Sequence, residues 1–290
     1  MLYDNALIIS VLADAYKLTK KQIYRETLEE TLDFIQREMK NTEPASGGLF
    51  FSAYDADSEG VEGKFYVWSK SEIEQILGDD AALFCQFYDI SEEGNWEETN
   101  ILHRDLGYEI FAKNKGLEVS FLKNNFRESR DKLLKVRDLR IKPGLDDKAL
   151  LSWNALMISA FARAHEALNT KNYAAIAQEV LESVLEKFKS NEKPYALFHT
   201  YKKGKAQYSA FLEDYAFLIE AMIDVYGVTF DKKYLHLAKE YTEFTLENFF
   251  DATENLFYFT SASQTDIILR KKKCSIRLHL RATRRWQKTF

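Results

Sequence analysis

Residues 149–188 read ALLSWNALMISAFARAHEALNTKNYAAIAQEVLESVLEKF and contain two helical patterns of different character. The first, Ala149–Ala162, is apolar almost all round, which is typical of a helix that is buried on most sides. The second repeats apolar side chains at i, i+3 and i+4 between Tyr173 and Phe188, which indicates a helix with one face in water. The stretch therefore predicts a helical hairpin made of an inner and an outer helix.

The same pattern occurs three times in the chain. In this copy, 12 residues separate Trp153 from His165, and a further 8 lead to Tyr173. The same two spacings start from Asp4 and from Asp214, and each copy ends on a Leu-Phe pair. The remaining anchors are Tyr16, Tyr24 and Leu49-Phe50 in the first copy, Leu197-Phe198 in the second, and Tyr226, Tyr234 and Leu256-Phe257 in the third. Equal spacings in three copies indicate an internal repeat.

Alternating inner and outer helices predict a toroid of helical hairpins. All inner helices of such a toroid run in the same direction, so equivalent repeat positions form a ring at one end. We therefore expect Asp4, Trp153 and Asp214 to share one mouth. Each outer helix returns the chain to that end, which places there the loops 46–63, 196–209 and 255–264.

The composition supports a helical globular protein. The 290 residues include only 3 prolines and 11 glycines, while 46% are hydrophobic. Helix breakers are therefore scarce and a sizeable core is expected, whereas strand-rich, turn-dense folds are disfavoured.

The 40 basic and 45 acidic residues are unevenly distributed, because residues 271–290 hold 8 basic residues and no acid. The acidic body argues against a nucleic-acid partner, since phosphate binding needs a basic face. No apolar run reaches the roughly 18 residues of a spanning helix, and MLYDNALIIS does not begin like a signal peptide. We expect no membrane partner and a cytoplasmic location. Cys85 and Cys274 form neither a disulfide framework nor a C-x-x-C motif.

Residues 64–140 fit the repeat less well. Lys64–Trp68 reads as a short strand, and helices are expected at 69–77, 80–88 and 119–137. The second and third copies begin 61 residues apart, so residues 1–270 hold fewer than the six hairpins that close a common helical toroid. The fold expected is all-α, an incomplete (α/α)6 toroid with a small strand-containing insertion.

Four motifs stand in separate parts of the chain: MLYDNALII (1–9), DADSEGVEGKFYVW (55–68), EEGNWEETNIL (92–102) and DDKALLSWNALMISAFARA (146–164). Together they resemble the proteins of the spermatogenesis-associated protein 20 and YyaL type over about residues 1–269. The resemblance implies a six-hairpin, glycosidase-like toroid preceded by a thioredoxin-like domain, and we expect that domain to be absent from this chain. It also implies that the similarity of this chain to the family ends near the basic tail. We expect a partial toroid at 1–269 and a non-homologous or disordered tail at 270–290.

Acidic side chains are the first candidates for catalysis. Asp55 and Asp57 lie in the acidic loop of residues 55–63, while Asp4 and Asp214 belong to the mouth. Glycoside chemistry needs two carboxylates that flank the bond, and several of these acids converge on one place. The alternative is that they cap turns and helix N termini, as acids in such positions commonly do.

His199 follows the Leu-Phe pair of the second copy and so belongs to the mouth loops. A histidine there could transfer protons, as an epimerase-like toroid requires. The alternative is a histidine with a purely structural role.

The candidates for substrate binding are aromatic and polar residues in the motif segments. Indole faces stack on the apolar faces of sugar rings, and amides or carboxylates bond hydroxyl groups. The residues are Trp68, Trp96, Trp153, Asn154, Glu59, Glu62 and Asn100. The alternative is that the indoles belong to the core and that the polar groups cap turns.

The sequence thus indicates a carbohydrate-related domain that binds a sugar and acts by hydrolysis or epimerisation through the mouth carboxylates. No metal site and no cofactor are expected. Two other hypotheses remain open: a non-catalytic binding or scaffold module for a separate redox domain, and an inactive truncated product.

Overall fold

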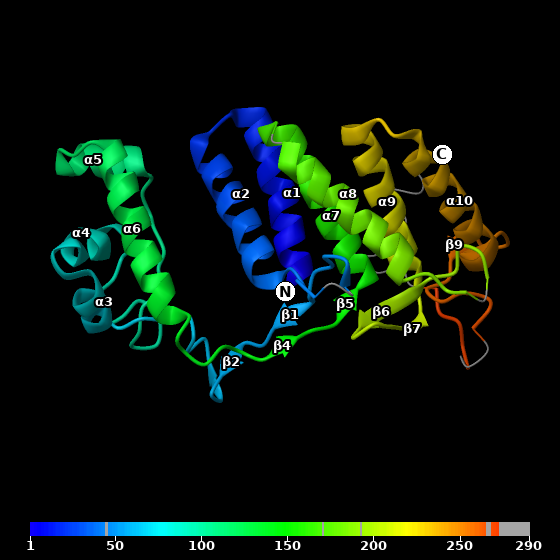
Figure 1. The fold of residues 1–290 in the computed structure, drawn as a ribbon, viewed down its shortest axis with the longest axis horizontal. Coiled ribbons are helices and arrows are strands. Elements are labelled where there is room, and N and C mark those ends of the chain that lie inside the picture. The colour runs from blue at the N-terminus through cyan, green and yellow to red at the C-terminus, as the bar shows by residue number, and fades with distance from the viewer. Residues whose placement is uncertain (44–45, 170, 192, 265–267, 273–290) are drawn as a thin grey trace. The chain divides into compact units, whose positions relative to one another are not determined.

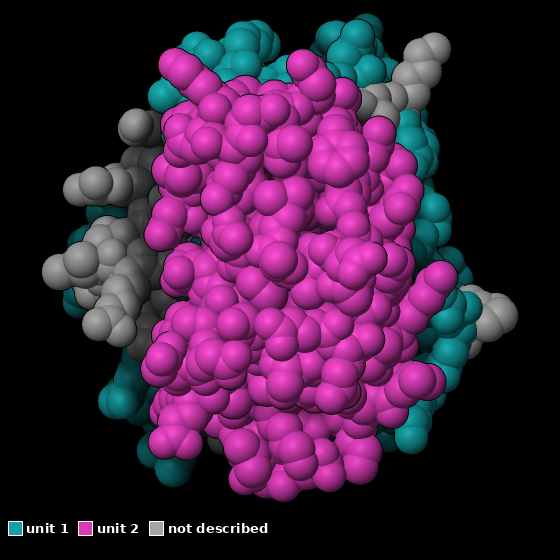
Figure 2. Space-filling view, turned by 90° about the vertical axis from the view of Figure 1, so that its left-hand side faces the viewer, with its two compact units in different colours: residues 1–53, 146–290 teal, residues 54–145 magenta. Residues whose placement is uncertain are grey.

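The computed structural model describes residues 1–43, 46–169, 171–191, 193–264 and 268–272. The chain forms two compact units (Figures 1 and 2). Unit 1 consists of residues 1–53 and 146–290, and unit 2 of residues 54–145. The chain leaves unit 1 through β1 (Ala53–Tyr54) and returns through β4 (Leu145–Asp146). Each unit is described by itself.

In its described residues, unit 1 contains three helical hairpins, one for each copy of the repeat (Figure 1). Each pairs an inner with an outer helix: α1 (Leu2–Thr19) with α2 (Gln22–Phe34), α7 (Leu151–Leu168) with α8 (Lys171–Lys187), and α9 (Leu212–Thr229) with α10 (Lys232–Phe249). The inner helix α7 packs between α1 and α9. The predicted all-α architecture of helical hairpins is confirmed. In the first hairpin, α2 continues into a short π-helix, η1 (Ile35–Met39).

The burial of the helices follows the two patterns in the sequence. Most side chains of α7 are buried, because this helix has inner helices on two sides and its own outer helix on a third. The outer helix α10 instead buries Tyr234, Ala238 and Tyr241 on one face and leaves Lys239 in solvent.

Each inner helix ends in the same way. Its C-cap residue takes a left-handed conformation, at Lys20 (φ 55°), Asn169 (φ 54°) and Phe230 (φ 57°). In every case the capping N–H donates to the carbonyl of the repeat anchor four residues earlier, which closes the last turn. The anchors at Tyr16, His165 and Tyr226 therefore mark the end of the inner helix.

Phe230→Gly is expected to stabilise unit 1 by about 0.5–1 kcal/mol, because the native side chain is held in the left-handed region and is largely exposed. Thermal or urea unfolding measures the gain. As a contrasting control, Lys239→Gly in the exposed interior of α10 should lose about 1 kcal/mol. Equal losses in both variants would contradict the strain at Phe230.

Short strands accompany the return of each outer helix. β5 (Ala149–Leu150), β6 (Phe198–Lys202) and β7 (Lys205–Ser209) form an antiparallel sheet in that order. In the third copy, β8 (Phe250–Asp251) pairs with β9 (Leu256–Phe257). Because β5 runs directly into α7, the pairing of Leu150 with Thr200 holds β6 beside the first turn of that helix.

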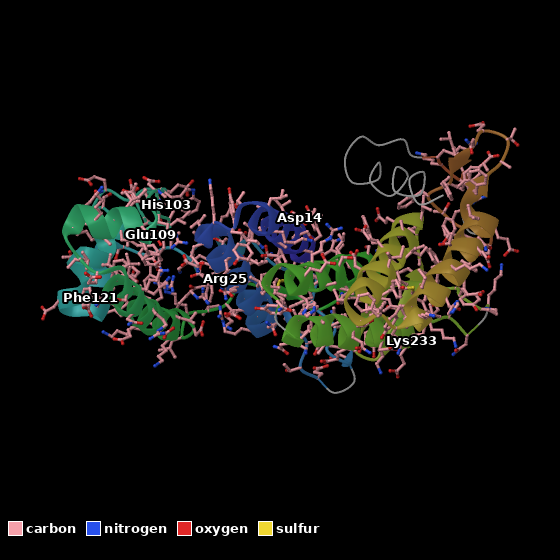
Figure 3. All side chains as sticks on the ribbon, turned by 90° about the horizontal axis from the view of Figure 1, so that it is seen from above. Asp14, Arg25, His103, Glu109, Phe121 and Lys233 are labelled. Atoms are coloured by element: carbon pink, nitrogen blue, oxygen red, sulfur yellow. The ribbon has the colours of Figure 1, made fainter. Side chains whose placement is uncertain are left out.

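A charged cluster connects the three inner helices. Arg163 of α7 lies 3.4 Å from Asp14 of α1, and 3.3 Å and 3.7 Å from Glu220 and Asp224 of α9. Asp14 is labelled on α1 in Figure 3. Burial raises the pKa of Asp224, and Arg163 opposes this shift only in part. One guanidinium therefore balances three carboxylates from two neighbouring helices.

Unit 2 has a core of its own, around Phe84, Phe87 and Phe126. Four α-helices and a 3-10 turn surround it: α3 (Lys70–Leu77), η3 (Gly78–Asp80), α4 (Ala81–Phe87), α5 (Tyr108–Lys115) and α6 (Val119–Arg137). Ser69 and Glu72 form a reciprocal capping box at the start of α3. The helices expected at 69–77, 80–88 and 119–137 are present within one or two residues, whereas α5 was not expected.

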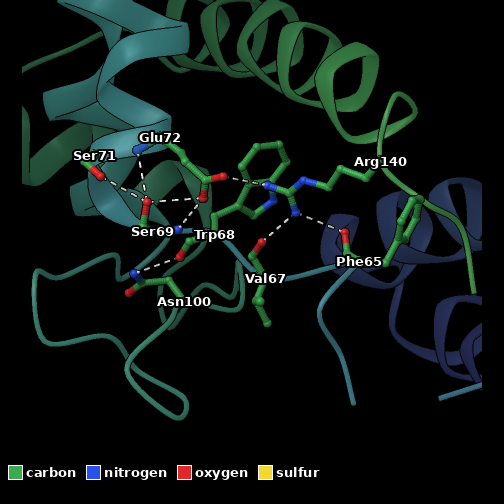
Figure 4. Close-up of polar contacts among 8 residues, drawn as sticks. All are labelled: Phe65, Val67, Trp68, Ser69, Ser71, Glu72, Asn100 and Arg140. Atoms are coloured by element: carbon green, nitrogen blue, oxygen red, sulfur yellow. Dashed lines mark hydrogen bonds and ion pairs between the residues drawn. The ribbon is translucent and has the colours of Figure 1, made fainter. Parts of the chain in front are cut away.

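The strand expected at Lys64–Trp68 was wrong. Residues 63–66 form a turn, and a single antiparallel bridge joins Trp68 to Asn100. Arg140 explains the difference, because it donates to the carbonyl of Phe65 at 3.2 Å and to that of Val67 at 2.8 Å (Figure 4). A side chain thus satisfies the backbone acceptors that a partner strand would use.

The predicted tail at 270–290 lies for the most part outside the described residues, which end at Lys272. Arg270 and Lys272 themselves contact the third hairpin. Among the residues that the structure describes, no helix is both long and apolar enough to cross a membrane.

Candidate functional site

A histidine and an aspartate meet at the mouth of unit 1, the end where the inner helices begin. The Nδ1 atom of His199 lies 2.8 Å from Oδ2 of Asp214. The same carboxylate accepts the backbone N–H groups of Ser152, at 3.1 Å, and Phe211, at 2.8 Å. Asp214 is fully buried, whereas the His199 side chain remains 20% exposed. The pair therefore has a buried anchor and a partly open imidazole.

The local fold explains why these two side chains meet. His199 lies on β6, which the sheet holds beside the first turn of α7. The β6–β7 hairpin then reverses the chain, so that α9 begins beside the strand that carries the histidine. Asp214 is the third residue of α9 and caps that helix through Phe211. It also joins α9 to α7 through Ser152.

The pair determines the protonation of the histidine. Burial alone would lower the pKa of His199, but the hydrogen bond and the charge of Asp214 outweigh it, and the pKa is raised. Glu213 adds to the increase. Because the carboxylate accepts at Nδ1, that nitrogen carries a proton and Nε2 is left to exchange one. The arrangement favours an imidazole that can take up a proton from a ligand.

Aromatic side chains surround this end of the inner helices. The rings of Tyr3 on α1 and Trp153 on α7 are 4.9 Å apart. The ring of Phe211 stands edge-on to His199 at 4.9 Å and stacks on Phe259 at 4.7 Å with an interplanar angle of 14°. Phe211 thus lies against the imidazole, and Trp153 directly follows Ser152, whose N–H donates to Asp214. Aromatic faces of this kind suit a sugar ring.

Of the predicted site residues of unit 1, the structure brings His199 and Asp214 into contact. Trp153, His199 and Asp214 lie at the first turns of α7 and α9 or beside them. Asp4 is in the first turn of α1, with its side chain 45% exposed and 3.6 Å from the chain's amino group. Asn154 is fully buried, and its amide exchanges hydrogen bonds with the backbone of Phe50, which gives it a structural role.

The other predicted residues lie in unit 2. Asp55, Asp57, Glu59 and Glu62 are exposed. Asp57 and Glu62 face each other across β2 (Asp57–Ser58) and β3 (Val61–Glu62), whose turn has positive φ at Glu59 (55°) and Gly60 (75°). This is the geometry of a type I′ hairpin turn. That these carboxylates take part in catalysis or binding stays a prediction.

Three further candidates of unit 2 have contacts within that unit. Trp68 is 3% exposed, and the guanidinium of Arg140 covers its ring at 4.0 Å (Figure 4). Asn100 is buried and donates to the carbonyls of Trp68 and Ser91. Trp96 is partly exposed and packs close to Gly63, where an added Cβ would come within 3.0 Å of the indole. Their part in sugar binding also stays a prediction.

Sequence reasoning missed three aromatic residues at this end of the inner helices. Tyr3, Phe211 and Phe259 are ordinary members of an aromatic-rich chain, and nothing in their spacing sets them apart. The signal that could have found Phe211 is its place three residues before Asp214, at the N-cap of an inner helix.

A small pocket lies beside the mouth, between the loop after α2 and the β6–β7 hairpin. Its lining includes Asn41, Tyr201 and Lys203. It also includes Lys202 and Asp147, which form an ion pair with each other that lowers the pKa of Asp147. Throughout the described ranges, no three His, Cys, Asp or Glu side chains are grouped so as to hold a metal ion.

Comparison with curated proteins finds relatives along most of the chain. An uncharacterized protein of Caenorhabditis elegans is 28% identical over 93% of this chain. Human spermatogenesis-associated protein 20 is 27% identical over 91% of it. The chain is similar to spermatogenesis-associated protein 20. This confirms the resemblance that the four motifs indicated. The chain spans about two fifths of these relatives, 40% of the Caenorhabditis protein and 37% of the human one.

Solved structures with a similar arrangement of helices are enzymes with low sequence identity. The cellobiose 2-epimerase of Spirochaeta thermophila has a TM-score of 0.49 and 10% identity, covering 85% of this chain and 42% of its own. A D-mannose isomerase has a TM-score of 0.41 and 13% identity, covering 90% of this chain and 62% of its own. A comparison with models of known protein families found no match.

Proposed function

We propose that the mouth of unit 1 binds a carbohydrate and that His199 transfers a proton on it. The observation that carries this proposal is the 2.8 Å contact between His199 Nδ1 and the fully buried Asp214. An imidazole held in this way has a fixed tautomer, a raised pKa and one nitrogen free for exchange, which are the properties of a general base. Asp214 orients the ring and stabilises the imidazolium that forms.

Proton transfer fits this site better than hydrolysis. A glycosidase needs two carboxyl groups flanking the scissile bond. Asp214 cannot serve as one of them, because it is fully buried and receives Ser152, Phe211 and His199 as hydrogen-bond partners. Of the two predicted catalytic acids of unit 1, Asp4 is then the exposed one. The proposed chemistry therefore runs through the histidine.

The proposed site uses a single base, His199, and this determines which type of proton transfer we expect. His199 Nε2 takes the proton from the carbon next to the carbonyl of an open-chain reducing sugar, which leaves an enediolate and an imidazolium. The imidazolium then returns that proton to the former carbonyl carbon, while the hydroxyl proton on the second carbon's oxygen passes to the oxygen of the first, and an aldose becomes a ketose with one base. Inversion at one carbon would need a second acid on the opposite face. The site thus supports an isomerisation ahead of an epimerisation, with Trp153 as a stacking surface for the ligand.

The test is hydrogen exchange in D2O with an aldose, a ketose and a reducing disaccharide, followed by NMR. The wild-type chain should incorporate deuterium next to the carbonyl carbon. His199→Gln should reduce the rate by about 10²–10⁴-fold, because the base is removed while the fold persists. His236→Gln, an exposed histidine of α10, is the matched control and should exchange as the wild type does.

Two results would contradict this proposal. Undiminished exchange by the His199→Gln variant would exclude the histidine as the base. Sugar binding by the wild-type chain without any exchange would favour the alternative of a binding module. The cytoplasmic location stays a prediction. The activity of the whole protein also stays a prediction, because this chain spans only about two fifths of the length of its curated relatives.

A further inference from the structure

The last described segment, residues 268–272, lies across the end of the third hairpin, and we call it the strap. Arg270 donates to the carbonyl of Thr260 at 2.7 Å and to that of Asn248 at 3.1 Å. Its guanidinium also lies 4.0 Å from the centre of the Tyr258 ring. The strap is therefore attached at three points by one side chain, one of them a carbonyl in the last turn of α10, where the helix dipole favours a cation.

A second cation fixes the other end of the strap. Lys272 lies 2.5 Å from Asp251 and 2.8 Å from Glu254, and its side chain is only 18% exposed. The pKa of Lys272 is raised and that of Asp251 is lowered by this contact. The ammonium group also lies over Tyr258, at 4.8 Å. Arg270 and Lys272 thus both contact the ring of Tyr258.

The strap is continuous with the histidine site through hydrogen bonds and ring contacts. The N–H of Phe259 donates to the carbonyl of Lys271 at 3.0 Å, and the carbonyl of Phe259 accepts the N–H of Leu212 at 3.0 Å. Leu212 is the first residue of α9. The ring of Phe259 stacks on Phe211, which contacts His199.

We propose that Arg270 and Lys272 are positioning residues for His199, since the strap that they anchor clamps Phe259 against Phe211 and the first turn of α9. The backbone of Phe211 donates to Asp214, so a shift of this turn changes the partner of the imidazole. The charged groups that act on His199 are Asp214 and Glu213, both in that same turn. For its effect on catalysis, this inference rests on the proposed function.

The test replaces the anchors while keeping their apolar stems, in the variants Arg270→Met and Lys272→Met. Amide hydrogen exchange should become about tenfold faster at Phe259 and Leu212, while the amides in the middle of α7 keep their protection. The pKa of His199, followed by NMR titration of its ring, should fall toward the ordinary value. Deuterium exchange into the sugar should drop about tenfold in kcat with little change in KM.

Two controls separate positioning from a general loss of stability. Lys239→Met removes an exposed lysine of α10 that pairs with Glu243 at 3.6 Å, and it should leave all three measurements unchanged. Lys272→Arg keeps the charge and the ring contact, and the pKa of His199 in this variant should stay at its wild-type value.

The proposal is overturned if His199 titrates as in the wild type in folded Arg270→Met and Lys272→Met. The same holds if protection falls equally throughout unit 1. If the titration shifts as expected but the wild-type chain exchanges no sugar proton, the strap is supported and the proposed function fails.

Discussion

Asp214→Asn should reduce sugar-proton exchange by at least about 10²-fold while unit 1 stays folded. Asparagine removes the negative charge that stabilises the imidazolium, and its NH2 group faces His199 and the N–H of Phe211 when it replaces Oδ2. The imidazole then accepts at Nδ1 and carries its proton on Nε2, which is the wrong tautomer for a base. The same Asp-to-Asn substitution in a serine protease triad lowers kcat about 10⁴-fold. Exchange in D2O measures the rate, and circular dichroism verifies the fold.

The same variant should lower the pKa of His199, because the contact that raises it is lost. The folded pKa of the wild-type histidine lies above that of the unfolded chain. Its contribution to stability is therefore complete below the unfolded pKa and is lost as the pH rises through the folded pKa. Asp214→Asn should remove this pH dependence between the two values. Unfolding free energies on either side of this window provide the measurement.

The matched control for Asp214 is another aspartate at a helix start. Asp231 accepts from the N–H of Lys233 at 3.0 Å and caps α10. Asp231→Asn should leave both the exchange rate and the pKa of His199 unchanged. If the two variants behaved alike, Asp214 would be only a helix cap, and the catalytic interpretation would have to be abandoned.

Arg163→Met should have the largest effect on stability, a loss of about 2–3 kcal/mol at neutral pH. The guanidinium contacts Asp14, Glu220 and Asp224, and its removal leaves three carboxylates without their shared cation. Breaking a buried pair costs about 3–5 kcal/mol, and the value expected here is lower because Asp14 is half exposed and Arg163 keeps some contact with water. Urea unfolding measures the change.

The pH dependence of this loss has a definite sign. The folded pKa of Asp224 is already raised by burial, and without Arg163 it should rise further. Since protonation then favours the folded state, part of the lost stability should return as the pH falls toward that raised pKa.

A pair of the same kind on the surface provides the comparison. Arg25, which is labelled in Figure 3, lies 3.0 Å from Glu29 on α2, and both side chains are about two fifths exposed. Arg25→Met should cost less than about 0.5 kcal/mol. A comparable loss in both arginine variants would show that the contacts between inner helices carry no special weight.

The repeat made much of unit 1 predictable. Anchors 12 and 8 residues apart identified three hairpins, because the length of an inner helix and its turn is the same in each copy. The left-handed C-caps at Lys20 and Phe230 were not predictable, since neither residue type indicates that conformation. The short strand expected near Trp68 is not formed, because a contact with a residue far away in the sequence replaces it. A distant arginine, Arg140, satisfies the backbone there.

The sequence identified individual residues of the candidate site but not the contacts between them. His199 and Asp214 both stood out in the sequence, but their contact depends on the β6–β7 hairpin that returns the chain to α9. Conversely, Asn154 and Asn100 have the right chemistry for a sugar ligand, yet both are buried and bonded to backbone groups. Sequence spacing cannot distinguish an amide that faces a ligand from one that completes the core.

The sequence by itself determined the alternation of inner and outer helices, because apolar periodicity and equal repeat lengths are local properties of the chain. It also determined that Asp4, Trp153 and Asp214 begin their helices at the same end. Only the tertiary structure decided that Asp214 is a fully buried partner of His199. The physical reason is that burial and hydrogen bonding depend on which segments pack together, and these contacts join residues that the repeat does not relate.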